Sequence, residues 1–304
     1  MIPSFEEFCL WTYVLVDECW AGVAPLDRRP GPAPRCSDPE LVTMALVGEC
    51  KGWDEETVLL SEWAAHRDLF PYQPSRTRFN RRRRRLQGAI NHLRRALLAT
   101  LDLARERRCV LDSLPVPVIR FHLVPKGARG YWQGHAAGFG RVPSKSITIF
   151  GYKLYLLATR AGVILDFTLA PANAPELTVG VGLLEEHTDL EVLGDKAFVS
   201  APVQARLRTE NRVELRTLTR SNQQVQLPPA EARALMAARQ VIETVNSQLA
   251  EQFGVEINHA QSFWGLTARL ITKLTAHTLC VTLNRLLGNP NLLHIKALAF
   301  PKPN

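Results

Sequence analysis

RCVLDSLPVPVI, the sequence of residues 108–119, decides the fold because it places one acid beside a short apolar run. The apolar and β-branched residues predict a buried strand that ends at Asp112, and Pro115 and Pro117 lack the amide that a central strand donates. A carboxylate at the end of a buried strand is costly unless it meets a cation or hydrogen-bond donors. We therefore expect Asp112 to meet a cation or a hydrogen-bond donor from elsewhere in the chain. The alternative is that Asp112 only caps the turn that follows it.

Bulk composition narrows the class of partner. The chain has 304 residues and a net charge of +8, which favours a polyanionic partner, with nucleic acid ahead of a membrane surface. No apolar run reaches the ~18 residues that a membrane-spanning helix needs, and the acidic N-terminus lacks the layout of a signal peptide. Six cysteines without a C-x-x-C pair predict reduced thiols in a cytosolic protein.

Residues 1–107 are predicted to form an all-helical, basic, DNA-binding region. Ser37, Pro39 and Glu40 have the order of a capped helix start. Residues 76–85 read RTRFNRRRRR, and adjacent like charges on one helix repel each other unless phosphates neutralise them. We predict DNA contacts for this run, with a solvated charged face as the alternative. The arginines concerned are Arg76, Arg78, Arg81, Arg82, Arg83, Arg84 and Arg85.

Residues 124–146 combine glycines, cations and aromatic side chains. Glycines permit close backbone approach, cations bind phosphate, and aromatic rings stack on bases. This composition predicts DNA contacts through Lys126, Arg129 and Lys145, with an ordinary flexible loop as the alternative. Lys153, Lys196 and Arg239 complete the set of predicted DNA contacts.

Residues 108–304 change from helical to mixed character. Strands are expected at 109–112, 147–158, 163–169, 190–193 and 213–218, the second and third as a hairpin. Helices are expected after 175, 202, 229 and 263. The pattern predicts an α/β domain with a mixed five-stranded sheet flanked by helices and followed by C-terminal helices.

Three acids stand at informative places in this pattern. Asp112 ends the first strand, Asp195 follows the fourth, and Glu243 lies among apolar residues of the long helix. If the first and fourth strands are neighbours, the two aspartates lie side by side, and a cation must separate them for both to stay ionised. Mg²⁺ and Mn²⁺ take oxygen ligands and suit such a site. Arg239, one turn before Glu243, either orients that acid or forms an ordinary surface pair with it.

Four local motifs carry a family resemblance. LDSLPVPV (111–118), FGYKLY (150–155), LGDKAF (193–198) and RQVIE (239–243) resemble the motifs of bacterial insertion-sequence transposases of the DDE type, most closely the insertion-sequence nine-eight-two family. The resemblance covers residues 75–295 and implies a ribonuclease H-like fold. Met236 and Ala250 replace the Tyr and Lys of a wider transposase signature, so the phosphate contacts of those two positions are not transferred. Pro175-Glu176 also replaces an expected His-Asp.

The resemblance implies that Asp112, Asp195 and Glu243 are catalytic and bind two Mg²⁺ ions, with Mn²⁺ as a substitute. It also implies double-stranded DNA as the partner, as terminal inverted repeats and target, and a homodimer on DNA in the bacterial cytoplasm, near the nucleoid. A metal-dependent nuclease without joining activity is one alternative, and a catalytically decayed DNA-binding protein is the other.

Overall fold

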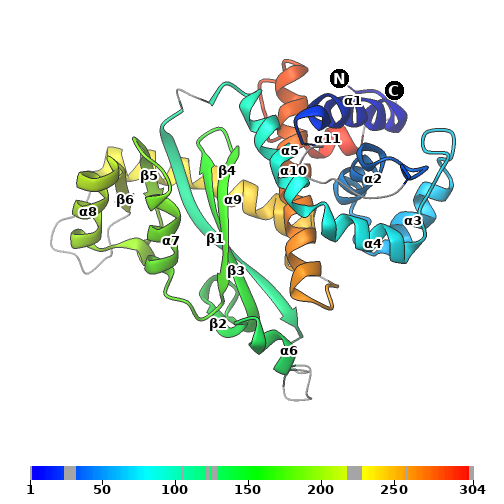
Figure 1. Cartoon of the computed structure of the whole chain (residues 1–304). Helices are drawn as coiled ribbons and strands as arrows, with labels where there is room; N and C mark the ends of the chain where they lie inside the picture. Colours follow the sequence, from blue (N-terminus) through cyan, green and yellow to red (C-terminus); the bar gives the residue numbers. More distant parts are fainter. Residues whose placement is uncertain are drawn as a thin grey trace. The chain divides into compact units, whose positions relative to one another are not determined.

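The computed structural model describes residues 2–23, 32–103, 106–120, 124, 129–217, 228–257 and 259–300. The chain forms two compact units. The first, which we call the helical unit, combines Met1–Asp102 with Gln248–Asn304. The second, which we call the sheet unit, is Leu103–Ser247 (Figure 1).

The helical unit is built around α2 and α10, which pack against each other. Ser37 caps α2 as its sequence predicts: the Ser37 Oγ accepts from the Glu40 amide at 3.2 Å, and the Glu40 carboxylate accepts from the Ser37 amide. Within the described part, its elements are α1 (Phe5–Val23), α2 (Asp38–Lys51), α3 (Glu56–Ala64), α4 (Arg76–Arg85), α5 (Gln87–Ala99), α10 (Phe263–Leu286) and α11 (Lys296–Ala299).

A buried ionic network joins distant parts of the helical unit. Glu49 of α2 accepts from Lys273 Nζ at 2.6 Å, and both side chains are only 2% exposed. Arg83 of α4 reaches Glu49 at 3.4 Å and Glu56 of α3 at 2.6 Å. Arg269 of α10 also pairs with Glu56, at 2.6 Å. Buried charges persist only when each is paired in this way, so the network ties the N-terminal helices to α10.

The sheet unit contains one mixed sheet in the order β2-β3-β1-β5-β6, with β4 also paired to β3. β1 runs antiparallel to β3 and parallel to β5, and β5 runs parallel to β6. The strands are β1 (Arg108–Ile119), β2 (Gly138–Val142), β3 (Ile147–Thr159), β4 (Ile164–Pro171), β5 (Glu191–Gly194) and β6 (Glu214–Thr217). The helices are α6 (Arg129–Gly134), α7 (Glu176–Glu185), α8 (Ala201–Asn211) and α9 (Pro229–Glu251), with short 3₁₀ turns η4 (Pro143–Lys145) and η5 (Lys196–Phe198).

β1 does not end at Asp112, contrary to the sequence-based expectation. It pairs with β3 through Pro115 and Pro117 as far as Ile119. Its pairing with β5 stops at Leu111, opposite Gly194. Beyond that point β1 pairs with one described strand instead of two, and prolines are tolerated on such an edge because no ladder amide is needed there.

The sheet has six strands, and the expectation of five was wrong because β2 lies in the segment predicted as a loop. Its sequence is GFGRV, which is too rich in glycine to read as a strand. The glycines are explained by close approach: a Cβ at Gly138 would lie 2.0 Å from the Asn173 side chain. A Cβ at Gly140 would lie 2.2 Å from the Ala172 carbonyl oxygen.

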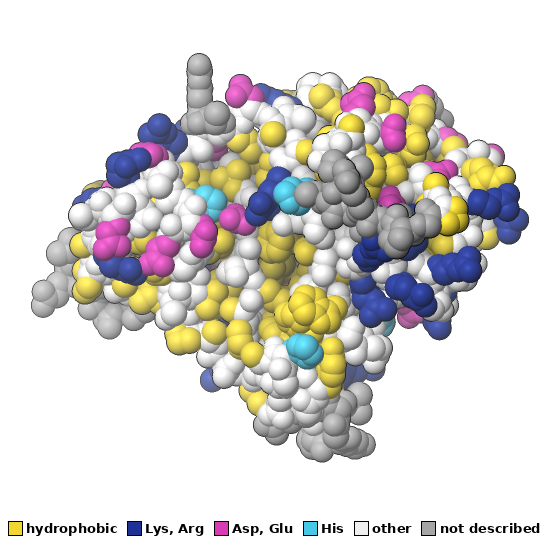
Figure 2. All heavy atoms as spheres, viewed as in Figure 1, with side chains coloured by type: hydrophobic (Ala, Val, Ile, Leu, Met, Phe, Trp, Pro, Cys, Tyr) yellow, Lys and Arg dark blue, Asp and Glu magenta, His cyan; other side chains and the backbone are white. Residues whose placement is uncertain are grey.

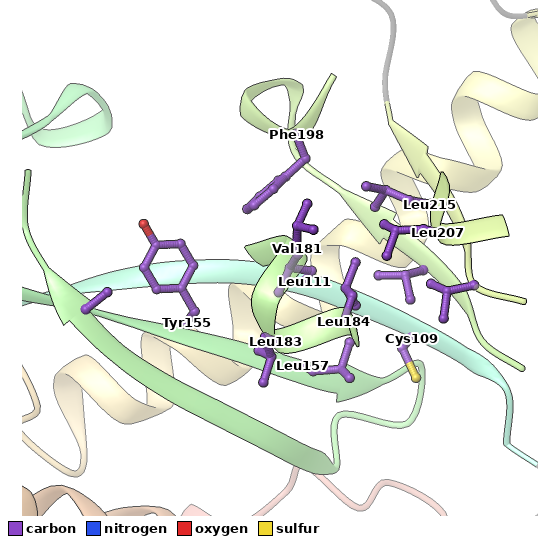
Figure 3. Packing of buried hydrophobic residues seen from close by; sticks show 13 residues of the cluster. Cys109, Leu111, Tyr155, Leu157, Val181, Leu183, Leu184, Phe198, Leu207 and Leu215 are labelled. Carbon is purple, nitrogen blue, oxygen red and sulfur yellow. The ribbon is translucent and has the colours of Figure 1, made fainter. Parts of the chain in front are cut away.

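The core of the sheet unit fills both faces of the sheet. Val192 belongs to a buried cluster with Leu111, Val181 and Leu184. Figure 3 shows the last three of these side chains beside α7. Leu193, the neighbour of Val192, points to the opposite face, where it meets residues of α9, as alternation along a strand requires. Asp112 follows Leu111 and therefore faces the side of α9.

Cysteines and apolar helices agree with the composition. All six cysteines are free thiols, as predicted. Within the described part of the chain, none of the helices combines the length and apolar character needed to cross a bilayer.

Candidate active site

The turn that presents Asp195 is fixed by an aromatic anchor. Phe198 inserts into the apolar cluster beside Val181 (Figure 3), so close to α7 that a Cβ at Gly180 would lie 2.3 Å from its ring. Its amide donates to the Asp195 carbonyl at 2.9 Å. The Asp195 carboxylate accepts from the Lys196 amide at 2.6 Å. The spacing Asp-x-x-Phe therefore has a structural cause, because the ring holds the turn and the turn holds the acid.

Asp112 and Asp195 occupy equivalent places on neighbouring strands. Leu111 pairs with Gly194. Asp112 is the next residue of β1, and Asp195 is the first residue after the end of β5. The sequence left it open whether these two strands are neighbours, and the parallel pairing of β1 with β5 meets that condition. The carboxyl ends of parallel strands in one sheet form the usual location of a reaction crevice.

Asp112 is a half-buried carboxyl with two hydrogen-bond donors. Burial raises its pKa to about 6, and the charge of Asp195 adds to that increase. The Ser113 amide donates to its Oδ1 at 2.8 Å, and Asn246 Nδ2 of α9 donates to its Oδ2 at 2.9 Å. The Ser113 hydrogen bond and the nearby Arg239 lower the pKa again, but burial has the larger effect. The ionised form of Asp112 is thus only partly stabilised by the protein.

Arg239 bridges two of the acids. Its Nη1 donates to Asp195 Oδ1 at 3.1 Å, and its Nη2 lies 3.9 Å from Glu243 Oε1. Arg239 is 24% exposed and the Asp195 side chain 40%, so this pair is partly screened by solvent. A cation of the chain itself therefore lies among the predicted metal ligands.

Glu243 is more exposed than its apolar neighbours suggest. Its side chain is 62% exposed, while Ile242 and Val245 are buried. Successive residues of an α-helix are about 100° apart, so α9 can bury Ile242 and Val245 and still leave Glu243 exposed. Among the described residues, no three His, Cys, Asp or Glu side chains are arranged to hold a metal ion. The carboxylate oxygens of Asp112, Asp195 and Glu243 are ligands that suit Mg²⁺. The Glu243 side chain, however, remains exposed and does not join the two aspartates in one metal site.

Two residues that sequence reasoning did not assign to the site act on Asp112 in the structure, one by a hydrogen bond and one by its charge. Asn246 binds Asp112 directly, and no residue signal beyond its place one turn after Glu243 pointed to it. Glu176, at the start of α7, raises the pKa of Asp112 through its charge. Lys153, predicted to bind DNA, is buried and pairs with Glu176 at 2.5 Å.

The predicted DNA-binding arginines of α4 fall into two groups. Arg82 donates to the Cys36 carbonyl at 2.9 Å and pairs with Asp38, and Arg83 belongs to the buried ionic network. The others lie on the surface of the helix; they are Arg76, Arg78, Arg81, Arg84 and Arg85.

The remaining predicted DNA contacts are distributed over the sheet unit. Lys145 lies exposed in η4, and Lys196 is exposed next to Asp195. Arg129 begins α6, and its side chain lies outside the described part. Lys126 lies outside the described residues altogether.

Comparison with known proteins gives one result. A family model described as the transposase DDE domain matches residues 137–263. The matched segment contains Asp195, Arg239 and Glu243, and Asp112 precedes it. No curated protein and no solved structure matches the chain. The family match supports a transposase of the DDE type, which implies an enzyme of the polynucleotidyl-transferase class acting on DNA.

Proposed function

We propose that this chain is a DDE transposase that cuts and joins DNA with Asp112, Asp195 and Glu243. One observation carries the proposal: Asp112 and Asp195 directly follow Leu111 and Gly194, the last residue pair that joins β1 to β5. The match to the transposase DDE domain over residues 137–263 supports the same function. Arg239 pairs with Asp195 and lies 3.9 Å from Glu243, which supports grouping these acids in one site.

The strand order supports a ribonuclease H-like fold. Antiparallel pairing of β4 with β3 and of β3 with β1, followed by parallel β5 and β6, agrees with the arrangement that the resemblance implies. β2 is then an addition at the edge of β3. The motifs at 111–118 and 193–198 support the insertion-sequence nine-eight-two family as the closer relationship.

Mg²⁺, with Mn²⁺ as a substitute, suits the proposed chemistry. Two such ions would be held by Asp112, Asp195 and Glu243, and they would supply charge stabilisation for the attacking and leaving oxygens of a phosphodiester. The protein's own residues prepare the site. Asn246 and the Ser113 amide orient the Asp112 carboxylate. Arg239 pairs with Asp195 in the metal-free protein, so a metal ion would compete with it for that carboxylate.

The proposed partners follow from this chemistry. We propose double-stranded DNA as substrate, first as the terminal repeats of an element and then as target. Joining two ends calls for at least two protomers on DNA, and the nucleoid in the bacterial cytoplasm is the proposed location. Residues 1–107 would carry DNA recognition and residues 108–304 the chemistry.

The test is incubation of the full chain with the DNA that flanks its own gene, in Mg²⁺, followed by mapping of strand breaks and joined products. Asp112→Asn should abolish both products while DNA binding persists. Asp189→Asn is the matched control, because Asp189 is an exposed acid of the same unit with a φ of 59°, which Asn tolerates.

Each outcome of this test is informative. Breaks and joined ends that disappear only in Asp112→Asn support the proposal. Breaks without joining, also with pre-cut ends, would assign a nuclease. If wild type and control produce no breaks, the proposed enzyme is refuted and a DNA-binding protein is left.

A further inference from the structure

α4 divides its arginines between two hollows of the helical unit. The hollows have similar volumes, about 480 and 520 Å³, so size does not separate them. Their linings differ in charge. Figure 2 shows Lys and Arg side chains gathered in the region where Figure 1 draws α3 and α4.

The smaller hollow is partly neutralised by acids in its own lining. It is lined by Arg76, Arg83, Arg84 and Arg269, but also by Glu55 and Glu56. Glu56 pairs with both Arg83 and Arg269 at 2.6 Å. Its two buried arginines therefore serve the folded structure, and its two acids offset part of the positive charge that the hollow offers to a ligand.

The larger hollow, which we call the arginine groove, has no acid in its lining. Five arginines contribute to it, together with Tyr72 and three prolines. The five are Arg35, Arg67, Arg78, Arg81 and Arg82. They come from the segment before α2, the segment after α3, and α4 itself.

Three of these cations are available to a ligand. Arg82 is occupied by Asp38 and the Cys36 carbonyl, and Arg35 stacks on the Tyr72 ring, 3.8 Å from its centroid. Arg67, Arg78 and Arg81 are exposed, and no carboxylate of the described ranges forms an ion pair with them. Exposed cations held this close together repel one another, and an anion removes that repulsion.

We propose that the arginine groove is a binding site for the phosphate backbone of duplex DNA. The inference rests on the proposed function. It adds Arg35, Arg67 and Tyr72 to the residues expected to bind the DNA substrate. Guanidinium groups match phosphate oxygens in pairs, and the stack on Tyr72 holds the Arg35 guanidinium in a fixed plane. The groove would hold DNA by its backbone, without reading sequence.

The experiment measures binding of a fluorescent DNA duplex to the full chain across a range of salt concentrations. The variant is Arg67→Ala with Arg78→Ala and Arg81→Ala. The slope of log K against log salt is negative, and each lost phosphate contact reduces its magnitude by about 0.9. In the triple variant the magnitude of the slope should therefore fall by about 2.7. Replacing the same arginines by Lys should restore most of the slope.

The matched control removes three arginines from the sheet unit, at 206, 208 and 212. These side chains are 45%, 68% and 67% exposed, and each pairs with a carboxylate of its own surface. The control loses the same formal charge and should keep nearly the wild-type slope. Thermal unfolding of all variants checks that each remains folded.

A folded triple alanine variant with wild-type affinity and slope would overturn the inference. The inference would also be overturned if the wild-type protein bound anionic phosphatidylserine vesicles but did not bind the DNA duplex. The proposed function fails separately, if wild type shows groove-dependent binding to the duplex yet neither cuts nor joins it. A chain that cuts and joins DNA with an unaltered slope in the triple variant would retain the proposed function and lose the groove.

Discussion

Asp112→Asn should make the metal-free protein more stable at neutral pH. Raising the pKa of this carboxyl from 3.8 to about 6 costs the ionised folded state at most about 3 kcal/mol, at 1.36 kcal/mol for each pKa unit. Partial solvent access reduces the gain, so we expect about 1–3 kcal/mol. Asn keeps the acceptor for the Ser113 amide. Asn246 Oδ1 is buried without a partner among the described residues, and rotation of that amide would let it accept from the new side chain.

The sign of the pH dependence follows from the raised pKa. The folded state binds this proton more tightly than the unfolded state, so its contribution to stability is complete below pH 3.8 and is lost as pH rises through about 6. The advantage of Asp112→Asn should therefore be nearly absent at pH 4, grow between pH 4 and 6, and stay constant above pH 7.

Urea unfolding in a chelator measures this difference, with hydrogen exchange of β1 peptides to isolate the sheet unit. The control Asp189→Asn loses an exposed ion pair and should gain no stability. A variant at position 112 that is less stable than wild type at pH 7.5 would refute the reasoning. Mn²⁺ should narrow the gap, because a cation bound to the folded state stabilises wild type by mass action.

Three further expectations test other parts of the structure. Lys273→Met leaves Glu49 buried beside Arg83 alone and should lower the free energy of unfolding by about 3–5 kcal/mol, measured by urea unfolding; an effect below about 1 kcal/mol would contradict a buried pair. Burial lowers the pKa of His277 from 6.5 to about 4, so wild-type stability should fall as pH drops from 6.5 to 4 by up to about 3 kcal/mol, and His277→Asn should flatten that fall; an unchanged slope in thermal melts would count against it. Arg239→Gln removes the cation beside Asp195 and should tighten Mn²⁺ binding severalfold in electron paramagnetic resonance titrations, whereas weaker binding would mean that Arg239 supports the metal rather than competes with it.

Sequence reasoning succeeded where one element supplied the whole signal. The cap of α2 and the hairpin of β3 and β4 depend on residues close together in the chain, and both are confirmed. The neighbouring positions of Asp112 and Asp195 followed only if their strands were neighbours. The structure meets that condition, because parallel β1 and β5 bring their carboxyl ends to one edge.

Sequence reasoning failed where the answer depends on what lies opposite. The prolines of β1 are acceptable only because β5 stops at Gly194. The glycines of β2 are typical of a loop in the sequence alone. The structure explains them, because Ala172 and Asn173 pack so closely that a Cβ has no room there. Within the arginine run of α4, nothing local distinguishes the side chains that meet buried acids from those that stay on the surface. For the same reason the exposure of Glu243 could not be foreseen from its apolar neighbours.

The composition of the helical unit from two chain segments limits how the protein can be dissected. Glu49 and Arg83 come from the first segment, but Lys273 and Arg269 come from the second. A fragment that stops at residue 102 would carry uncompensated buried charge and should be degraded rapidly in cells. A shortened protein that joins residue 102 to residue 248 through a flexible linker would keep the salt-bridged interior, and it is the smaller version to try for crystallisation with DNA.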